Sequence, residues 1–260
     1  MTGVADLVAT DIILEARGLT KEFKGFVAVA GVDLRVRRGS VHALIGPNGA
    51  GKTTCFNLLT HFLTPTRGSI FFKGQEITGL PPAAIARRGL IRSFQISAVF
   101  PHLTVLENVR LALQRRRRGR SFDFWRADTV LGALDAEARA LLDAVGLGEQ
   151  AAARAVELAY GRKRALEIAT TLALDPELML LDEPTAGMSQ EDVERITALI
   201  KTAAASRTVL MVEHNLAVVA ALCQRVTVLA RGEVLAEGDY AEVSRNPAVV
   251  EAYLGVAVHA

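Results

Sequence analysis

The sequence has few of the residues that mark several protein classes. Only two of its 260 residues are cysteine, Cys55 and Cys223, which excludes a disulfide scaffold and gives no metal-ligand spacing. No apolar run approaches the roughly 20 residues of a membrane-spanning helix, and the start of the chain lacks the cationic and apolar segments of a signal peptide. The 30 Lys and Arg nearly balance the 28 Asp and Glu, so no strong overall field steers a partner. We therefore expect a soluble intracellular protein.

What the chain does have is a globular composition. Half of its residues are apolar and 22% are charged, which is enough to build a buried core and argues against disorder. The length fits one domain or a core with a smaller appended lobe. No internal repeat or low-complexity tract interrupts it.

The order of patterns along the chain predicts an α/β core with a helical insertion. Residues 12–77 alternate as strands and turns, whereas residues 82–161 are rich in Ala, Leu and Arg at helical spacing. Strands separated by helices in the last hundred residues indicate a mostly parallel sheet. The apolar runs that we expect to be buried strands are Val41–Ile45, Leu178–Leu181, Thr208–Val212 and Arg225–Ala230.

A glycine-rich segment between a predicted strand and a predicted helix matches the phosphate-loop pattern G-x-x-x-x-G-K-[ST]. Backbone N–H groups of such a loop and the helix N-terminus form an anion site. Lys52 adds a charge at the β- and γ-phosphates, and the Thr53 hydroxyl is a ligand for Mg²⁺. A glycine turn that merely precedes a helix is the alternative. The predicted nucleotide-binding residues here are Gly46, Pro47, Asn48, Gly49, Ala50, Gly51, Lys52, Thr53 and Thr54.

Two carboxylates end the buried strand at Leu178–Leu181. Because parallel strands present their carboxyl ends at the edge where ligands bind, Asp182 and Glu183 are expected beside the phosphate loop. Asp182 is predicted to hold the Mg²⁺ shell, and Glu183 to orient and deprotonate the water that attacks the γ-phosphate. An exposed acidic turn before Pro184 is the structural alternative.

Two further polar residues are candidates for the same site. His214 follows the apolar run Thr208–Val212 and Glu213, and we predict that it contacts the γ-phosphate, although a histidine after a strand is usually a surface residue. Gln95 follows Phe94, where the core gives way to the helical insertion. A single glutamine carries almost no signal by itself.

Taken in order, these motifs resemble those of the ATP-binding-cassette (ABC) ATPases. The set comprises the phosphate loop, Gln95, the stretch 158–162, the Asp182–Glu183 pair and His214, and its spacing matches the family over nearly the whole chain. More narrowly, the sequence is similar to the ATP-binding subunits of branched-chain amino acid uptake systems. The stretches that carry this narrower resemblance are 89–95, 103–109, 166–169, 182–188 and 246–255.

The resemblance implies a P-loop NTPase core with an N-terminal antiparallel β-subdomain and a helical subdomain. The whole chain, 1–260, is then one ATP-binding domain. The nucleotide-binding core is expected at about 12–90 and 165–240, the helical subdomain at about 91–164 and a C-terminal helical tail at about 241–260.

The resemblance also implies how nucleotide is bound. ATP and Mg²⁺ are sandwiched between two cassettes, each ATP lying on one subunit's phosphate loop and under the other's signature segment, here Ala159, Tyr160 and Gly161. Phe23 matches the aromatic residue that stacks on adenine, with core packing as the alternative, and Val29 joins it as a nucleotide-binding residue. Gln95 is placed among the catalytic and metal-binding residues, alongside Glu183 and His214.

Two departures from the family pattern stand out. The common signature Leu-Ser-Gly-Gly-Gln has Ala159, Tyr160 and Arg162 in place of its serine, first glycine and glutamine, so the serine hydroxyl that would touch the γ-phosphate is missing. The segment after the carboxylates usually ends in aspartate and here ends in Ser189. With Asp192 three residues on, Ser189 fits a helix capping box equally well.

The helix that follows the signature starts with three cations. Arg162, Lys163 and Arg164 fall in its first turn, where the helix dipole disfavours positive charge. One hypothesis is that a partner's nucleotide docks there and relieves the strain. Three solvated side chains are the alternative.

The run Arg115–Arg120 is the strongest local charge. A solvated loop is the usual explanation of such a run, and contact with anionic lipid headgroups is a second. Nucleic-acid binding is a third, since Phe122, Phe124 and Trp125 follow and can stack on bases, although these aromatics also suit packing within the insertion.

The function that follows is ATP hydrolysis driving import of a small solute, with branched-chain amino acids expected. Related urea or amide importers and lipid or lipopolysaccharide exporters are alternatives. Partners implied are a second cassette, identical or paralogous, transmembrane permease subunits and, indirectly, a substrate-binding protein. The location implied is cytoplasmic, on the inner face of the membrane.

Two other function classes are disfavoured. A nucleic-acid or ribosome-associated cassette protein is disfavoured because 260 residues leave no room for the usual insertions. A regulator without hydrolysis is disfavoured because the set of site residues is complete.

Overall fold

The structure is a computed structural model that describes residues 11–93, 99–116 and 128–257. Packing divides the chain into two compact units. The first comprises residues 1–90, 177–184 and 204–260, and the second comprises residues 91–176 and 185–203.

A four-stranded antiparallel sheet opens the first unit, in the strand order β2-β1-β4-β5. Its strands are β1 (Ile12–Phe23), β2 (Phe26–Arg37), β4 (Arg67–Phe72) and β5 (Gln75–Glu76). The β1–β2 hairpin closes through Lys24 and Gly25, both at positive φ, as a two-residue hairpin turn requires. This confirms the antiparallel N-terminal subdomain, although β1 and β2 are longer than the apolar alternation in the sequence indicates.

The second sheet has six strands in the order β10-β9-β3-β8-β7-β6. Strands β9, β3, β8 and β7 are neighbours in parallel, and β10 pairs antiparallel with β9 at the edge. All four predicted buried strands are therefore confirmed. The strands are β3 (Val41–Ile45), β6 (Leu90–Ser93), β7 (Leu178–Asp182), β8 (Thr208–Val212), β9 (Arg225–Ala230) and β10 (Glu233–Gly238).

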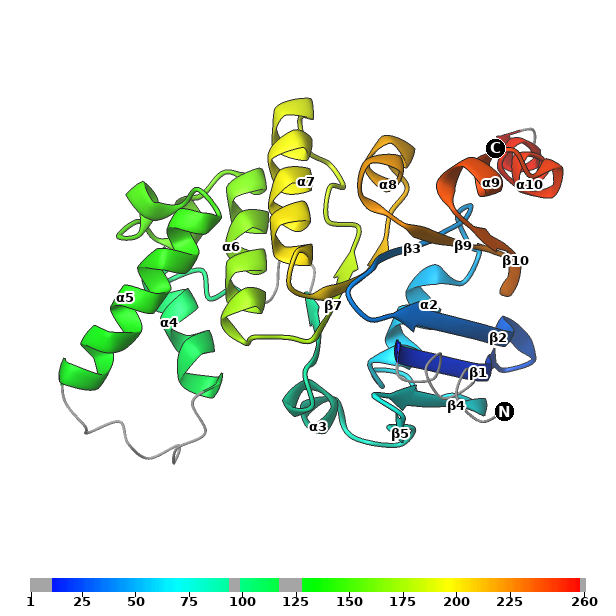
Figure 1. Cartoon of the computed structure of the whole chain (residues 1–260), viewed down its shortest axis with the longest axis horizontal. Coiled ribbons are helices and arrows are strands. Elements are labelled where there is room, and N and C mark those ends of the chain that lie inside the picture. The colour runs from blue at the N-terminus through cyan, green and yellow to red at the C-terminus, as the bar shows by residue number, and fades with distance from the viewer. Residues whose placement is uncertain (1–10, 94–98, 117–127, 258–260) are drawn as a thin grey trace, which may run out of the picture. The chain divides into compact units, whose positions relative to one another are not determined.

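The helices of the first unit flank these sheets (Figure 1). They are α2 (Lys52–Leu59), α3 (Pro82–Arg87), α8 (Leu216–Leu222), α9 (Tyr240–Ser244) and α10 (Pro247–Ala257). Helix α2 ends at Leu59; after it the Thr60 hydroxyl donates to the Phe56 carbonyl, and His61 takes a positive φ. Phe56 is fully buried in a core formed by residues of both sheets. This packing holds α2, and with it the end of the preceding loop, against the sheets.

The second unit is built mainly of helices. They are α4 (Val105–Arg116), α5 (Asp128–Ala144), α6 (Tyr160–Ala173) and α7 (Gln190–Ala204), with short 3-10 turns η2 (Gly148–Gln150) and η3 (Ala155–Glu157). Helix α6 packs on α4 and α5, and α7 belongs to the same unit.

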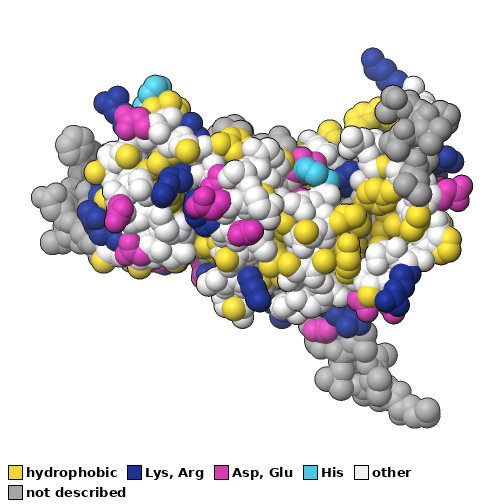
Figure 2. All heavy atoms as spheres, turned by 90° about the horizontal axis from the view of Figure 1, so that it is seen from above, with side chains coloured by type: hydrophobic (Ala, Val, Ile, Leu, Met, Phe, Trp, Pro, Cys, Tyr) yellow, Lys and Arg dark blue, Asp and Glu magenta, His cyan; other side chains and the backbone are white. Residues whose placement is uncertain are grey.

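The described residues include no helix long and apolar enough to cross a membrane. On the face drawn in Figure 2, basic and acidic side chains are interspersed rather than gathered by sign. This agrees with the near-balance of charge in the sequence.

A buried ion pair lies inside α6. Arg164 Nη1 is 2.7 Å from Glu167 Oε2, and the two side chains are only 6% and 2% exposed. The Arg164 guanidinium also lies 5.8 Å from the centre of the Tyr160 ring. Removing one partner of such a pair leaves the other charge buried and uncompensated.

We expect Arg164→Met to lower the free energy of unfolding by about 3–5 kcal/mol, because the Glu167 carboxylate would stay buried without its cation. The double variant Arg164→Met, Glu167→Leu should recover much of this loss. Arg195→Met breaks exposed pairs on α7 and is the control, expected to cost less than about 1 kcal/mol. Chemical denaturation of the four proteins measures these differences, and equal losses at Arg164 and Arg195 would contradict the assignment.

A histidine lies in the middle of the six-stranded sheet. His42 on β3 is fully buried, and its Nε2 is 2.8 Å from the Thr227 hydroxyl on β9. Burial lowers the pKa of His42 from 6.5 to about 4. The ring is therefore neutral in the folded protein at pH values where it is already charged in the unfolded chain.

The unfolded chain then takes up a proton at His42 below about pH 6.5, whereas the folded protein does so only near pH 4. Stability should accordingly fall on acidification across this window, by about 1.4 kcal/mol per pH unit from this group. Urea midpoints measured between pH 7 and pH 4.5 should show a shallower loss for His42→Gln. The exposed His102→Gln is the control, and a slope unchanged in His42→Gln would refute the role of His42.

Candidate functional site

The predicted phosphate loop runs from the end of β3 to the start of α2. Gly46, Gly49 and Gly51 all take positive φ, which glycine adopts without steric cost. Two of them also have no room for a side chain, since a Cβ on Gly46 would lie 2.1 Å from the Leu229 carbonyl oxygen and one on Gly51 would lie 2.5 Å from that of Ala28. The loop is thus wedged between β9 and β2.

Lys52 turns its ammonium back into this loop. Its Nζ donates to the carbonyl oxygens of Gly46, at 2.7 Å, and Pro47, at 2.9 Å. Burial lowers the pKa of Lys52, and the nearby Glu183 and Asp182 carboxylates oppose that shift. The N-terminus of α2 has no side-chain cap, so its N–H groups and this cation are arranged to meet an anion.

The remaining loop residues differ in exposure. Asn48, Gly49 and Thr53 are exposed, Pro47 and Thr54 are half-buried, and Ala50 is buried. The exposed Thr53 hydroxyl is therefore open to a ligand, whereas Ala50 contributes its backbone, whose carbonyl accepts from the Gly232 N–H at 3.1 Å.

The two predicted carboxylates lie at the end of β7. Asp182 is 4% exposed, and the Glu183 side chain is one-third exposed. Glu183 takes a φ of 45°, an uncommon backbone conformation for this residue type that costs on the order of 1–2 kcal/mol. A hydrogen bond from its N–H to the Val212 carbonyl, at 2.9 Å, holds this turn against β8.

His214 lies at the end of the neighbouring strand. Its Nδ1 is 3.9 Å from Glu183 Oε1, and its side chain is 59% exposed. The structure therefore brings together the loop residues, Asp182, Glu183 and His214 in one unit, as the parallel sheet predicted. The alternative interpretation, an exposed acidic turn, is wrong for Asp182, because this residue is buried.

The donor set suits Mg²⁺ only together with a nucleotide. The described residues contain no group of three His, Cys, Asp or Glu side chains able to hold a metal ion by themselves. A hydroxyl from Thr53 and a carboxylate from Asp182 are oxygen donors of the kind that Mg²⁺ uses with substrate phosphates. The residues present fit a nucleotide-bound ion.

Phe23 and Val29 have different environments. Phe23 is 41% exposed near the tip of the β1–β2 hairpin. The alternative that this side chain packs in the core is therefore wrong. Lys21 Nζ lies 5.1 Å from the centre of its ring and donates to the Thr64 carbonyl at 2.8 Å. Val29 is fully buried and packs behind Gly51, so its side chain supports the loop from inside rather than offering a binding surface.

The signature residues lie in the second unit, at the start of α6. Ala159 and Tyr160 are exposed, and Ala159 gives the helix no side-chain cap. Gly161 is buried against the Asp192 carboxyl group, where a Cβ would lie 2.5 Å from Asp192 Cγ. Close packing against Asp192 therefore requires glycine at position 161, and nothing in the sequence indicated this contact.

Several predicted residues lie outside the described part of the chain. These are Gln95, most of the basic run, and the aromatics that follow it, namely Arg117, Arg118, Arg120, Phe122, Phe124 and Trp125. Of the run, Arg115 and Arg116 are described, and the Arg116 guanidinium forms an ion pair with Glu137.

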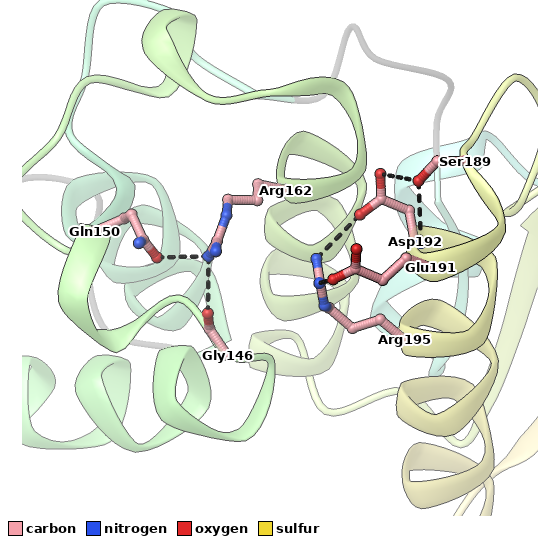
Figure 3. Close-up of polar contacts among 7 residues, drawn as sticks. All are labelled: Gly146, Gln150, Arg162, Ser189, Glu191, Asp192 and Arg195. Atoms are coloured by element: carbon pink, nitrogen blue, oxygen red, sulfur yellow. Dashed lines mark hydrogen bonds and ion pairs between the residues drawn. The ribbon is translucent and has the colours of Figure 1, made fainter.

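The hypothesis that a partner's nucleotide docks at Arg162, Lys163 and Arg164 stays a prediction, and two of these side chains have partners within the chain. Arg162 Nη1 already donates to Gln150 Oε1 at 2.9 Å and to the Gly146 carbonyl at 3.3 Å (Figure 3), and Arg164 is buried against Glu167. Both side chains turn back into their own unit, which compensates for their position in the first turn.

Ser189 acts as the cap that its spacing predicted. The Asp192 N–H donates to Ser189 Oγ at 3.3 Å, and Ser189 Oγ donates to Asp192 Oδ2 at 3.1 Å (Figure 3). Arg195 then pairs with Asp192 and Glu191 at 3.0 and 2.7 Å. The N-terminus of α7 is thus fixed within the unit.

One site residue had no role in the sequence analysis. Glu213, directly before His214, is fully buried, which is rare for a carboxylate. The only signal in the sequence is a glutamate at the end of an apolar strand, and that pattern does not distinguish a buried carboxylate from an exposed one.

Comparisons with known proteins agree with this geometry. A sequence model described as "ABC transporter" matches residues 29–186, and one described as "Branched-chain amino acid ATP-binding cassette transporter" matches residues 233–259. The high-affinity branched-chain amino acid transport ATP-binding protein BraF of Pseudomonas aeruginosa is 40% identical over 255 residues, covering 94% of this chain and 98% of BraF. LivG of Escherichia coli K12, which carries the same description, is 39% identical over 254 residues, with the same coverage of both chains.

Solved structures show the same fold. The ADP conformation of MJ1267, an ATP-binding cassette of an ABC transporter, is 30% identical with a TM-score of 0.81, covering 94% of this chain and 99% of that one. A dimeric post-hydrolysis state of the cassette MJ0796 bound to ADP and Pi is 26% identical with a TM-score of 0.76, covering 88% and 99%. From its phosphate loop to its C-terminal segment, the chain belongs to the ATP-binding cassettes of the ABC transporter family.

Proposed function

We propose that this protein is the ATP-hydrolysing subunit of an importer for branched-chain amino acids. The observation that carries the chemistry is that the loop with Lys52 follows β3 and that Asp182 and Glu183 lie at the end of β7, in the same parallel sheet. Both carboxylates oppose the lowering of the Lys52 pKa by burial. The solute class rests on the descriptions of the similar BraF and LivG proteins and on the match of the C-terminal segment.

The chain's own residues supply binding and orientation. Backbone N–H groups of the loop and the start of α2 surround the phosphates, and Lys52 moves its hydrogen bonds from two carbonyls to phosphate oxygens. Thr53 and Asp182 would hold Mg²⁺, which would neutralise phosphate charge. Glu183 accepts the proton of the attacking water, and His214, whose Nδ1 is 3.9 Å from Glu183 Oε1, contacts the γ-phosphate. Gln95 is proposed as a further residue of the catalytic and metal-binding set.

A pair of cassettes is proposed as the working state. The dimeric MJ0796 structure, bound to ADP and Pi, supports this arrangement. Ala159, Tyr160 and Gly161 would face the nucleotide of the partner, and the missing serine leaves recognition to backbone N–H groups. Phe23, exposed at 41%, is proposed to stack on adenine. Permease subunits would hold the pair at the inner face of the membrane.

Replacing Lys52 by Ala should weaken ATP binding by about 10–100-fold, since hydrogen bonds to charged groups contribute about 1.5–3 kcal/mol each. Calorimetric titration with a non-hydrolysable analogue measures this loss. The exposed Lys201→Ala is the matched control and should bind as the parent does. Unchanged affinity in Lys52→Ala would remove the loop from the nucleotide site.

Replacing Glu183 by Gln should lower turnover by about 10²–10⁴, because the amide cannot accept the proton from water. Affinity for ATP should stay within about twofold, since Gln keeps the size and shape of the side chain. Phosphate release measures turnover, with the exposed Glu233→Gln as the control. Turnover at the parent rate would remove Glu183 as the base.

A further inference from the structure

Glu213 connects β8 to the turn that carries His214. The residue is fully buried, yet it ends a strand at the ligand-binding edge of the sheet. Its Oε2 accepts hydrogen bonds from the backbone N–H groups of His214, at 2.9 Å, and Asn215, at 3.0 Å. One carboxylate oxygen therefore fixes two successive peptide units.

The turn is held from its other side as well. The Asn215 side chain caps α8 by accepting from the N–H groups of Ala217, at 3.1 Å, and Val218, at 3.4 Å. Between these two sets of bonds the backbone at His214 has little freedom, although its side chain is 59% exposed. A fixed backbone fixes the position and direction of the Cα–Cβ bond from which the imidazole extends.

The position of His214 matters because the proposed catalytic base, Glu183, lies beside it. The Glu183 backbone N–H bonds the Val212 carbonyl at 2.9 Å, and the side chains of Glu183 and His214 approach to 3.9 Å. Residues 212 to 214 thus set both the proposed base and the histidine from the same end of β8.

We propose that Glu213 is a positioning residue for ATP hydrolysis, which holds the His214 backbone through its two amide bonds so that the imidazole meets the γ-phosphate. This inference rests on the proposed function. Glu213 acts through the turn, as a positioning residue rather than a catalytic one.

The charge of Glu213 is not what the turn requires. Two N–H donors need an oxygen acceptor at this distance, and an amide oxygen serves as well as a carboxylate. Glu213→Gln preserves that acceptor and the length of the side chain. Glu213→Asp keeps the charge but is shorter by one methylene, and Glu213→Ala removes the acceptor altogether.

The test is steady-state ATP hydrolysis by the full chain, with kcat and KM determined for each variant. Glu213→Gln should stay within about threefold of the parent. Glu213→Ala and Glu213→Asp should lose about tenfold or more in kcat with KM for ATP changed less than about twofold, because small misplacements of a catalytic group cost up to about 10²-fold. Circular dichroism and thermal unfolding verify that the variants fold.

A double-variant cycle with His214→Ala separates positioning from general support of the fold. If Glu213 acts through His214, Glu213→Ala adds no loss in the His214→Ala background. Losses that multiply would overturn the proposal, as would full activity in both Glu213→Asp and Glu213→Ala. Should Glu213→Ala fail to fold, Glu213→Asp takes its place in the cycle with the same two outcomes.

The failure of this inference differs from the failure of the proposed function. Parental hydrolysis in Lys52→Ala and Glu183→Gln would refute the proposed function itself. Loss in those two variants, together with parental activity in His214→Ala, would overturn only the role of His214 and of Glu213 behind it.

Discussion

The site depends on one buried cation held in a loop of backbone. Lys52 is 8% exposed and its ammonium is hydrogen-bonded to two loop carbonyls. Burial alone would favour the neutral amine, and the Asp182 and Glu183 carboxylates act against this. Strand β3, which leads into the loop, and strand β7, which leads to the two carboxylates, must therefore end at one edge of the sheet, and the parallel order of β3, β8 and β7 provides this.

The backbone around Lys52 is closely packed, and the strained backbone conformation at Glu183 belongs to this region of the site. Gly46 and Gly51 touch carbonyl oxygens of β9 and β2 so closely that any side chain would collide, and Glu183 takes a φ of 45° beside them. Strained or close-packed backbone of this kind persists where the surroundings over-determine it. The fully buried core beneath α2 supplies that constraint.

In the second unit, the notable electrostatic feature is positive charge at the N-terminus of α6. Its α6 helix begins without a side-chain cap and with three cations, which is locally unfavourable. Arg162 and Arg164 each bond an oxygen of the same unit, which offsets part of this cost. Gly161 admits the Asp192 carboxyl group, which ties the start of α6 to the capped start of α7.

Residue order alone predicted four strands of the six-stranded sheet and the phosphate loop, because apolar runs and glycine spacing are local properties. The tertiary structure decided what depends on distant contacts. It assigned α6 and α7 to one unit, turned Arg162 and Arg164 inward, exposed Phe23 and buried Val29 and Glu213. Burial and ion pairing arise between residues that meet only after folding, so no local pattern encodes them.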